Sequence, residues 1–161
     1  MRKTSFLTAG LIWALSAPAS QAAGEHWKVT HEPKRTSDGS PICQIWHGTQ
    51  PPLIGITAAK GAQLLAVAAD DLKAVESPQV QGAMRFLSRR SYALRFTVKK
   101  SGSAGPNAVA MISDADIGSI MVQIALGGTV TVEVGNSVDL NFPIDGAASE
   151  STAFMRCRDK L

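Results

Sequence analysis

Hydrophobic and polar residues alternate most regularly in the last third of the chain. Every second residue is apolar over 130–134 and again over 138–144, and Gly135-Asn136 lies between the two runs. A period of two is typical of a strand that buries one face and exposes the other. The Gly-Asn dipeptide suits a two-residue turn, because both residues tolerate a positive φ. The pattern therefore predicts a β-hairpin over 129–144.

Two segments with helical spacing flank this hairpin. The first covers 114–125, with Ser113 as its N-cap and Gly127 after its last turn. Its apolar residues recur three and four positions apart, at Ile117, Ile120, Met121 and Ile124. A second helix is expected over 147–160, where Phe154 and Cys157 share one stripe. These elements are typical of a packed edge of a small domain.

Shorter alternating runs fill the chain before these helices. They predict strands over 26–30, 42–48, 53–57, 80–87, 92–99 and 108–112. Residues 58–75 fit either a helix or a strand over 63–69 that ends at Asp70-Asp71, and the neighbouring strands favour the strand. The fold class is mainly β (α+β). We expect an antiparallel sheet or sandwich of about seven strands, with two helices that cover an edge or a barrel mouth.

The N-terminus has the pattern of a secretory signal peptide. Arg2 and Lys3 precede an apolar run over 6–15, and Ser20-Gln21-Ala22 is a small-x-small cleavage site. The apolar run is too short to span a membrane, and no later run is long enough. We therefore expect a signal over 1–22 and a single domain over 23–161, periplasmic or secreted and without a transmembrane segment after signal removal.

The chain has two cysteines, Cys43 and Cys157. In an oxidising compartment an even count indicates a disulfide. Joining residues more than a hundred positions apart stabilises a domain by about 4–5 kcal/mol in the chain-entropy model. The alternative is a pair of inert or metal-binding thiols, but the chain has no CxxC pair.

Charge argues against a nucleic-acid partner. The formal net charge is +3, but removing Arg2 and Lys3 from the 16 basic residues leaves 14 against 13 acidic residues. Phosphate binding needs a concentrated basic surface. The local basic cluster is Arg85, Arg89, Arg90, Arg95 and Lys99-Lys100. A solvated strand face explains this cluster more simply than an anion-binding patch.

Candidate chemistry is sparse. His26, His31 and His47, with nearby carboxylates, are the candidates for a metal site, but nothing in their spacing forces the ligands to converge as HExxH does. The chain has no GxSxG motif, and its paired aspartates fit turn and helix-start positions. We therefore expect no cofactor. Trp27 and Trp46 are candidates for a recognition surface, because aromatic residues often anchor interfaces.

The C-terminal third resembles a known family. The expected helix of 116–126 is followed by glycine at 127–128 and by Thr-Val-Thr-Val at 129–132. The hairpin then leads into Phe-Pro-Ile at 142–144, and Gly-x-Ala follows at 146–148. This order is similar to the end of small exported bacterial proteins of the invasion-associated locus B type, and related proteins also have a late cysteine, as Cys157 is here. The chain lacks the additional central cysteines of that family. The resemblance implies an envelope protein without known catalysis, and it carries over no active-site residue.

These observations lead to three hypotheses about function. The first is a non-enzymatic protein that contacts an envelope component through the tryptophan-bearing N-terminal strands or through the hairpin of 85–100. The second is an exported metal-dependent hydrolase that uses the histidines. The third is an inhibitor of an extracellular hydrolase, with the loop of 101–107 as its contact segment.

Overall fold

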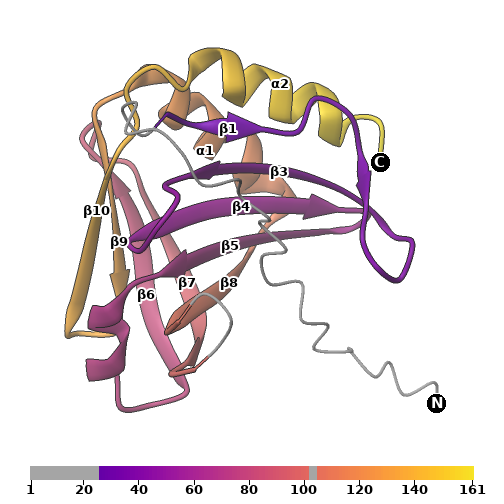
Figure 1. The fold of residues 1–161 in the computed structure, drawn as a ribbon. Helices are drawn as coiled ribbons and strands as arrows, with labels where there is room; N and C mark the ends of the chain where they lie inside the picture. The colour runs from indigo at the N-terminus through magenta and orange to yellow at the C-terminus, as the bar shows by residue number, and fades with distance from the viewer. Residues whose placement is uncertain (1–25, 102–104) are drawn as a thin grey trace.

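The structure is a computed structural model that describes residues 26–101 and 105–161. The predicted signal peptide and residues 102–104 of the predicted inhibitory loop lie outside the described residues. Ten strands form one antiparallel sheet, and two α-helices lie across one end of it (Figure 1). The prediction of a mainly β, antiparallel fold with two helices, the last at the C-terminus, is confirmed.

The elements follow the chain in a simple order. They are β1 (Lys28–Val29), β2 (Lys34–Arg35), β3 (Pro41–His47), β4 (Leu53–Ala59), β5 (Ala62–Ala68), the 3-10 helix η1 (Asp70–Ala74), β6 (Gln79–Phe86), β7 (Ser91–Lys99), β8 (Asn107–Ile112), α1 (Asp114–Leu126), β9 (Thr129–Val134), β10 (Val138–Pro143) and α2 (Ala148–Arg158). In space the strand order is β1-β3-β4-β5-β8-β7-β6-β9-β10, and β2 also pairs with β3.

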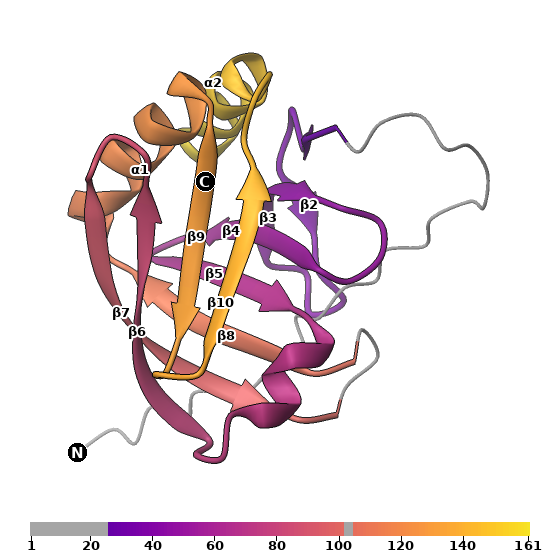
Figure 2. The ribbon, with the colours of Figure 1, turned by 90° about the vertical axis from the view of Figure 1, so that its left-hand side faces the viewer.

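The sheet curls on itself. Strands β3, β4 and β5 run across Figure 1, whereas β9 and β10 run down it, and Figure 2 shows the same change of direction from another side. The two ends of the strand order meet where the indole Nε1 of Trp27 donates a 3.1 Å hydrogen bond to the carbonyl of Pro143. The curl therefore brings β1 and β10 together at one corner and encloses the core between the two halves of the sheet.

Gly82 shows how close the strands approach on the inside of the curl. A Cβ atom on this residue of β6 would lie 2.0 Å from the carbonyl oxygen of Glu133 and 2.9 Å from the ring of Phe96. A glycine inside a strand often marks a tight bend or a close backbone approach. Gly82 thus permits the approach of β9 and of the Phe96 ring that any larger side chain would prevent.

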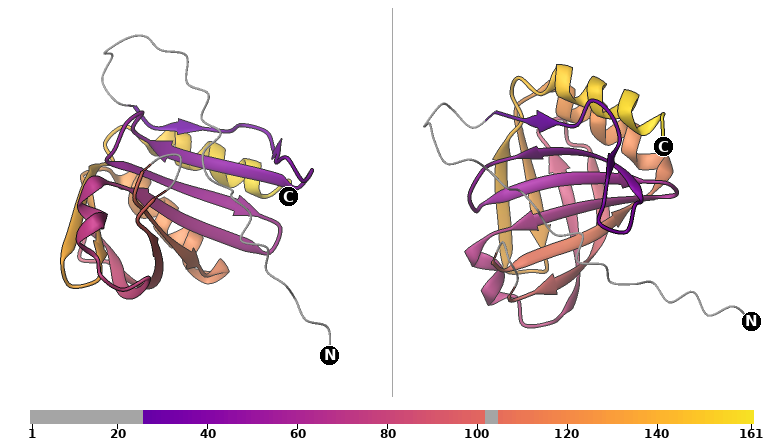
Figure 3. Two further views of the ribbon diagram at one scale, coloured as in Figure 1. Left: turned by 60° about the horizontal axis from the view of Figure 1, so that its bottom comes forward. Right: turned by 45° about the vertical axis from the view of Figure 1, so that its right-hand side comes forward.

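Alternation of side chains divides the sheet into an inner and an outer face. The inner positions of the long strands are buried in one continuous core, with Phe96, Ile45, Ile54, Ile56, Leu65 and Met84 among its largest side chains. Figure 3 shows α1 and α2 together at one end of the sheet, and apolar residues of both helices belong to the same core. Ser113 caps α1 by accepting a 3.1 Å hydrogen bond from the backbone N–H of Asp116, as the sequence predicts.

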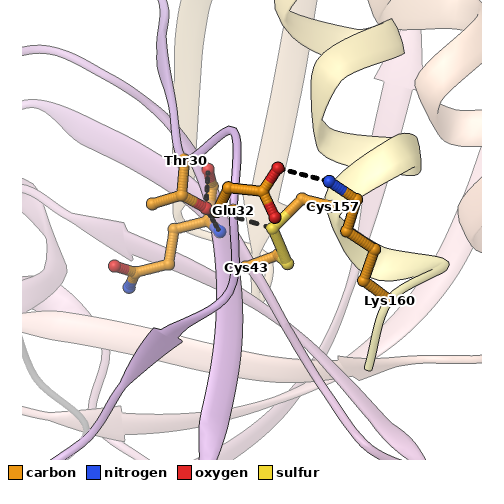
Figure 4. Close-up of a disulfide and its surroundings, with 6 residues drawn as sticks. Thr30, Glu32, Cys43, Cys157 and Lys160 are labelled. Carbon is orange, nitrogen blue, oxygen red and sulfur yellow. Dashed lines mark hydrogen bonds and ion pairs between the residues drawn. A yellow bond between two sulfur atoms is a disulfide. The ribbon is translucent and has the colours of Figure 1, made fainter.

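A disulfide holds α2 on the sheet. Cys43 on β3 and Cys157 on α2 are bonded, fully buried and 114 positions apart in sequence, so the predicted pairing is confirmed. Figure 4 shows the bond beside Thr30, whose Oγ1 lies 3.7 Å from Cys157 Sγ, and beside the exposed ion pair of Glu32 and Lys160. Because α1 packs against α2, this covalent bond also restrains the first helix.

The structure confirms some of the local predictions and corrects others. Residues 62–68 form strand β5, which confirms the strand alternative for this segment, and η1 then begins at Asp70. The structure has ten strands where the sequence indicates about seven. The individually predicted runs number nine, counting 63–69 and the two strands of the hairpin, and the two-residue strand β2 is the one that none of them covers. The predicted two-residue turn is wrong, because Val134 pairs with Val138 and three residues connect them.

Among the residues that the structure describes, no helix has the length and apolar character needed to cross a membrane.

Removing the disulfide tests its contribution to stability. The variant Cys43→Ser/Cys157→Ser is expected to lose about 2–5 kcal/mol of unfolding free energy, because the unfolded chain regains the freedom of a very long loop. Urea unfolding of the oxidised protein and of the variant gives the difference, and the reduced wild type should match the variant. Identical midpoints for all three samples would show that the bond does not stabilise the fold.

Candidate contact surface

Four neighbouring strands carry no charged side chain. In β3, β4, β5 and β8, no position is Asp, Glu, Lys or Arg. The absence is expected for the inner positions, which are buried in the core. It is unusual for the outer positions, because a water-exposed sheet face ordinarily alternates with polar residues. We call the outer positions of these strands the uncharged face: Gln44, Trp46, Gly55, Thr57, Leu64, Ala66, Val109 and Met111.

Strand register places these residues in two parallel rows. One row runs across the sheet through Trp46, Gly55, Ala66 and Val109. The other runs through Gln44, Thr57, Leu64 and Met111, and the Gln44 amide donates a 3.2 Å hydrogen bond to Thr57 Oγ1. Most of these side chains are half-buried, and Met111 is 58% exposed. The two rows form a continuous outer surface that is largely apolar.

Cations flank the uncharged face on both sides. Lys28 of β1 pairs with Trp46 at one end of the first row. At the other end Val109 pairs with Thr97 of β7, and the outer positions next to Thr97 are Arg95 and Lys99. All three cationic side chains are exposed, and β1, β3, β4, β5, β7 and β8 contain no acidic residue. The surface is therefore an apolar centre between two positive borders.

The predicted basic cluster divides among different places. Arg95 borders the uncharged face, whereas Arg85 forms a 2.8 Å ion pair with Glu133 of β9. Arg89 and Arg90 lie in the exposed turn between β6 and β7. The predicted cluster is thus divided among three places and does not form one continuous patch.

The two candidate tryptophans have opposite positions. Trp46 lies on the outer face of β3 and is half-buried. Trp27 is only 6% exposed and belongs to the core, where its ring centroid lies 5.4 Å from that of His47. Trp27 therefore contributes to closing the sheet and is not part of a recognition surface.

The histidines do not form a metal centre in the described part of the chain. His26 and His31 are exposed, and His47 is 4% exposed beside Trp27. Among the described residues, no group of three or more histidine, cysteine, aspartate or glutamate side chains is placed to hold a metal ion. The geometry gives no support to the hydrolase hypothesis.

A shallow depression lies between the β4–β5 turn and the end of α2. Its lining includes Gln63, Asp114 and Arg158. Asp114 accepts a 2.8 Å hydrogen bond from Gln63 Nε2 and forms a 3.0 Å ion pair with Arg158, so these groups partner one another.

Hydrogen bonds from the Thr36 hydroxyl and the Ser40 backbone lower the pKa of the fully exposed Asp38 carboxyl. Neither place has the arrangement of a catalytic site.

Comparison with known proteins adds no relative. No family model, no curated protein and no solved structure matches the chain. The resemblance of its C-terminal third to proteins of the invasion-associated locus B type stays a prediction.

Substitution of two adjacent β8 residues tests which face is outside. Met111→Asp is expected to change the unfolding free energy by less than about 0.5 kcal/mol, because an exposed position accepts a charge. Ala110 is 2% exposed on the inner face, so Ala110→Asp should cost more than about 3 kcal/mol through an unpaired buried charge. Thermal unfolding of both variants provides the comparison. Equal losses would contradict the assignment of faces.

Proposed function

We propose that this protein is an exported bacterial protein, periplasmic or secreted, that acts by binding another component of the cell envelope and not by catalysis. The uncharged face is the observation that carries the proposal. Contiguous apolar surface between polar borders is characteristic of interaction sites, because exposing it to water is unfavourable. Burying it against a partner removes that cost.

The composition of the face suits a protein partner. Aromatic residues and methionine are enriched at the centres of protein interfaces, and charged residues are depleted there. Trp46 and Met111 occupy the face, and all eight of its positions are uncharged. A half-buried tryptophan also loses little conformational freedom on binding, since the surrounding sheet already orients it. Trp46 is therefore the expected anchor of the interface.

The positive borders argue for a partner other than a second copy of the chain. In a two-fold dimer through this face, the axis lies in the plane of contact, and the strands of the two copies are aligned when the axis runs along them or across them. With the axis along the strands, Lys28 of one copy meets the Arg95 and Lys99 border of the other. With the axis across the strands, each border meets its own equivalent. Like charges oppose each other in both cases, so a partner with an apolar centre and an acidic rim fits better.

The buried disulfide supports the proposed location. Cys43 and Cys157 are both bonded, and structural disulfides persist in secreted and periplasmic proteins. An exported location also agrees with the signal-peptide pattern of residues 1–22 and with the exported family that the C-terminal third resembles. An exported, covalently restrained domain with a prepared apolar surface is suited to contact within the envelope.

Site-directed photo-crosslinking in bacterial cells tests the proposal. A photoreactive residue at Met111 is expected to give a discrete crosslinked product, because this exposed side chain lies on the face that the partner covers. The matched control replaces Asn141, which is exposed on the outer face of β10. The control should give no such product. Identical products from both positions, or none from Met111, would contradict a partner at the uncharged face.

A further inference from the structure

In the described part of the chain, three of the four exposed large apolar residues gather at a second place, away from the uncharged face. Leu87 is 74% exposed in the β6–β7 turn, and Leu126 and Val122 of α1 are 71% and 57% exposed. Figure 2 shows this turn beside α1 at the same end of the molecule. We call the group of Leu87, Val122 and Leu126 the apolar corner.

Contacts between the turn and the helix hold the corner together. Val122 and Leu126 are four residues apart in α1 and so lie on one helix face. Between them, the Gln123 side chain accepts a hydrogen bond from the Ser88 hydroxyl in the turn. A Cβ atom on Gly128, just beyond α1, would lie 2.9 Å from Leu87 Cδ1. Leu87 therefore lies against the chain segment that follows Leu126.

Two contacts of Tyr92, at the start of β7, hold the β6–β7 turn in place as well. Tyr92 Oη and Ser119 Oγ are 2.5 Å apart, which joins the start of β7 to the middle of α1. The rings of Phe86 and Tyr92 pack edge to face with centroids 6.0 Å apart. The turn and the helix that carry the apolar corner are thus held in place by side-chain contacts.

Two arginines stand beside the apolar side chains. Arg89 and Arg90 follow Leu87 in the turn, and both are exposed. A carboxylate also lies at the corner, because Asp145 accepts a 2.7 Å hydrogen bond from the Gly128 backbone N–H. The corner therefore combines protruding apolar groups with a local excess of positive charge.

Arg89 occupies a backbone conformation that disfavours its side chain. Its φ is +65°, the value for the position where glycine or asparagine is the usual residue of such a turn. The turn is closed by hydrogen bonds from Arg89 N to Phe86 O and from Phe86 N to Arg90 O, of 3.0 and 2.9 Å. Glycine here would relieve the backbone strain, so the arginine at this position calls for an explanation.

We propose that the apolar corner is a peripheral membrane site for an anionic phospholipid surface. The side chains of Leu87, Val122 and Leu126 enter the boundary between lipid headgroups and acyl chains. Surface elements that combine an apolar face with basic residues bind membranes at this depth. Arg89 and Arg90 bind lipid phosphates, for which the guanidinium is the best-matched side chain. The charge complementarity is between two exposed arginines and a negative bilayer surface.

The shape of the corner favours a bilayer over a protein segment. Its apolar groups project from a turn and from a helix end, with more than half of each side chain exposed. A bilayer closes around projecting side chains, whereas a protein partner would need a matching cavity with acidic walls. The corner shares no residue with the uncharged face, so one molecule can bind a membrane and a protein partner together.

Vesicle binding of the mature, oxidised protein tests the proposal. It should co-sediment with vesicles of phosphatidylcholine and phosphatidylglycerol, bind weakly to phosphatidylcholine alone, and dissociate as salt is raised. Each arginine is expected to contribute about fivefold to the partition constant, so Arg89→Gln/Arg90→Gln should weaken binding by about twenty-fold or more. Leu87→Ser/Leu126→Ser should weaken it at every salt concentration.

Two further variants separate this site from general effects on the fold. Arg89→Gly should raise the melting temperature, because glycine adopts the positive φ without strain, and should still weaken vesicle binding. Arg95→Gln/Met111→Ser removes a charge from the border of the uncharged face and an apolar group from the face itself, and it should leave vesicle binding unchanged. Intact vesicle binding by this variant, together with crosslinking from a photoreactive residue at Met111 in the otherwise unchanged protein, distinguishes the two surfaces.

The proposal is overturned if phosphatidylglycerol vesicles are not bound, or if Arg95→Gln/Met111→Ser weakens binding as much as the corner variants. It is also overturned if a photoreactive residue at Leu87 crosslinks a soluble acidic protein in cells while vesicles are not bound. That outcome would assign the corner to a protein segment.

Discussion

The covalent bond between β3 and α2 is the constraint on which this structure depends. The curled sheet encloses apolar residues but is open at one end, and α1 and α2 cover that end (Figure 3). Phe154 and Cys157 of α2 are fully buried, although α2 is short and surrounds them with polar and charged residues. Such a helix has little intrinsic stability. The disulfide therefore keeps it over the core and, through α2, keeps α1 there as well.

The same curl explains how two contact surfaces arise on a small domain. Strands β5 and β8 are neighbours although η1, β6 and β7 separate them in sequence, and this pairing makes the uncharged face continuous. The β6–β7 hairpin that lies between them in sequence carries Leu87 to α1 at its tip. Insertion of that hairpin thus creates the apolar corner, while the pairing of the flanking strands creates the face.

Features that depend on local periodicity could be predicted from the sequence, and those that depend on strand order could not. The helix of α1, the strands of β9 and β10 and the strand over 63–69 follow from the spacing of their own residues. The disulfide follows from two cysteines and a secretory signal pattern. Strand order, the curl at Gly82 and the pairing of β5 with β8 are non-local. Trp27 and Trp46 differ in burial because register, not residue type, decides which side of the sheet each one faces.

Methionine oxidation in living cells tests most directly whether a partner covers the uncharged face. Met111 is 58% exposed, whereas Met84 and Met121 are 0% and 3% exposed in the core, and exposed thioethers oxidise first. With hydrogen peroxide and mass spectrometry, Met111 should oxidise readily in the purified protein and slowly in intact cells, relative to the half-buried Met155 of α2. Met84 and Met121 should stay reduced in both samples. Equal rates for Met111 in cells and in the purified protein would show that the face is uncovered and would contradict the account.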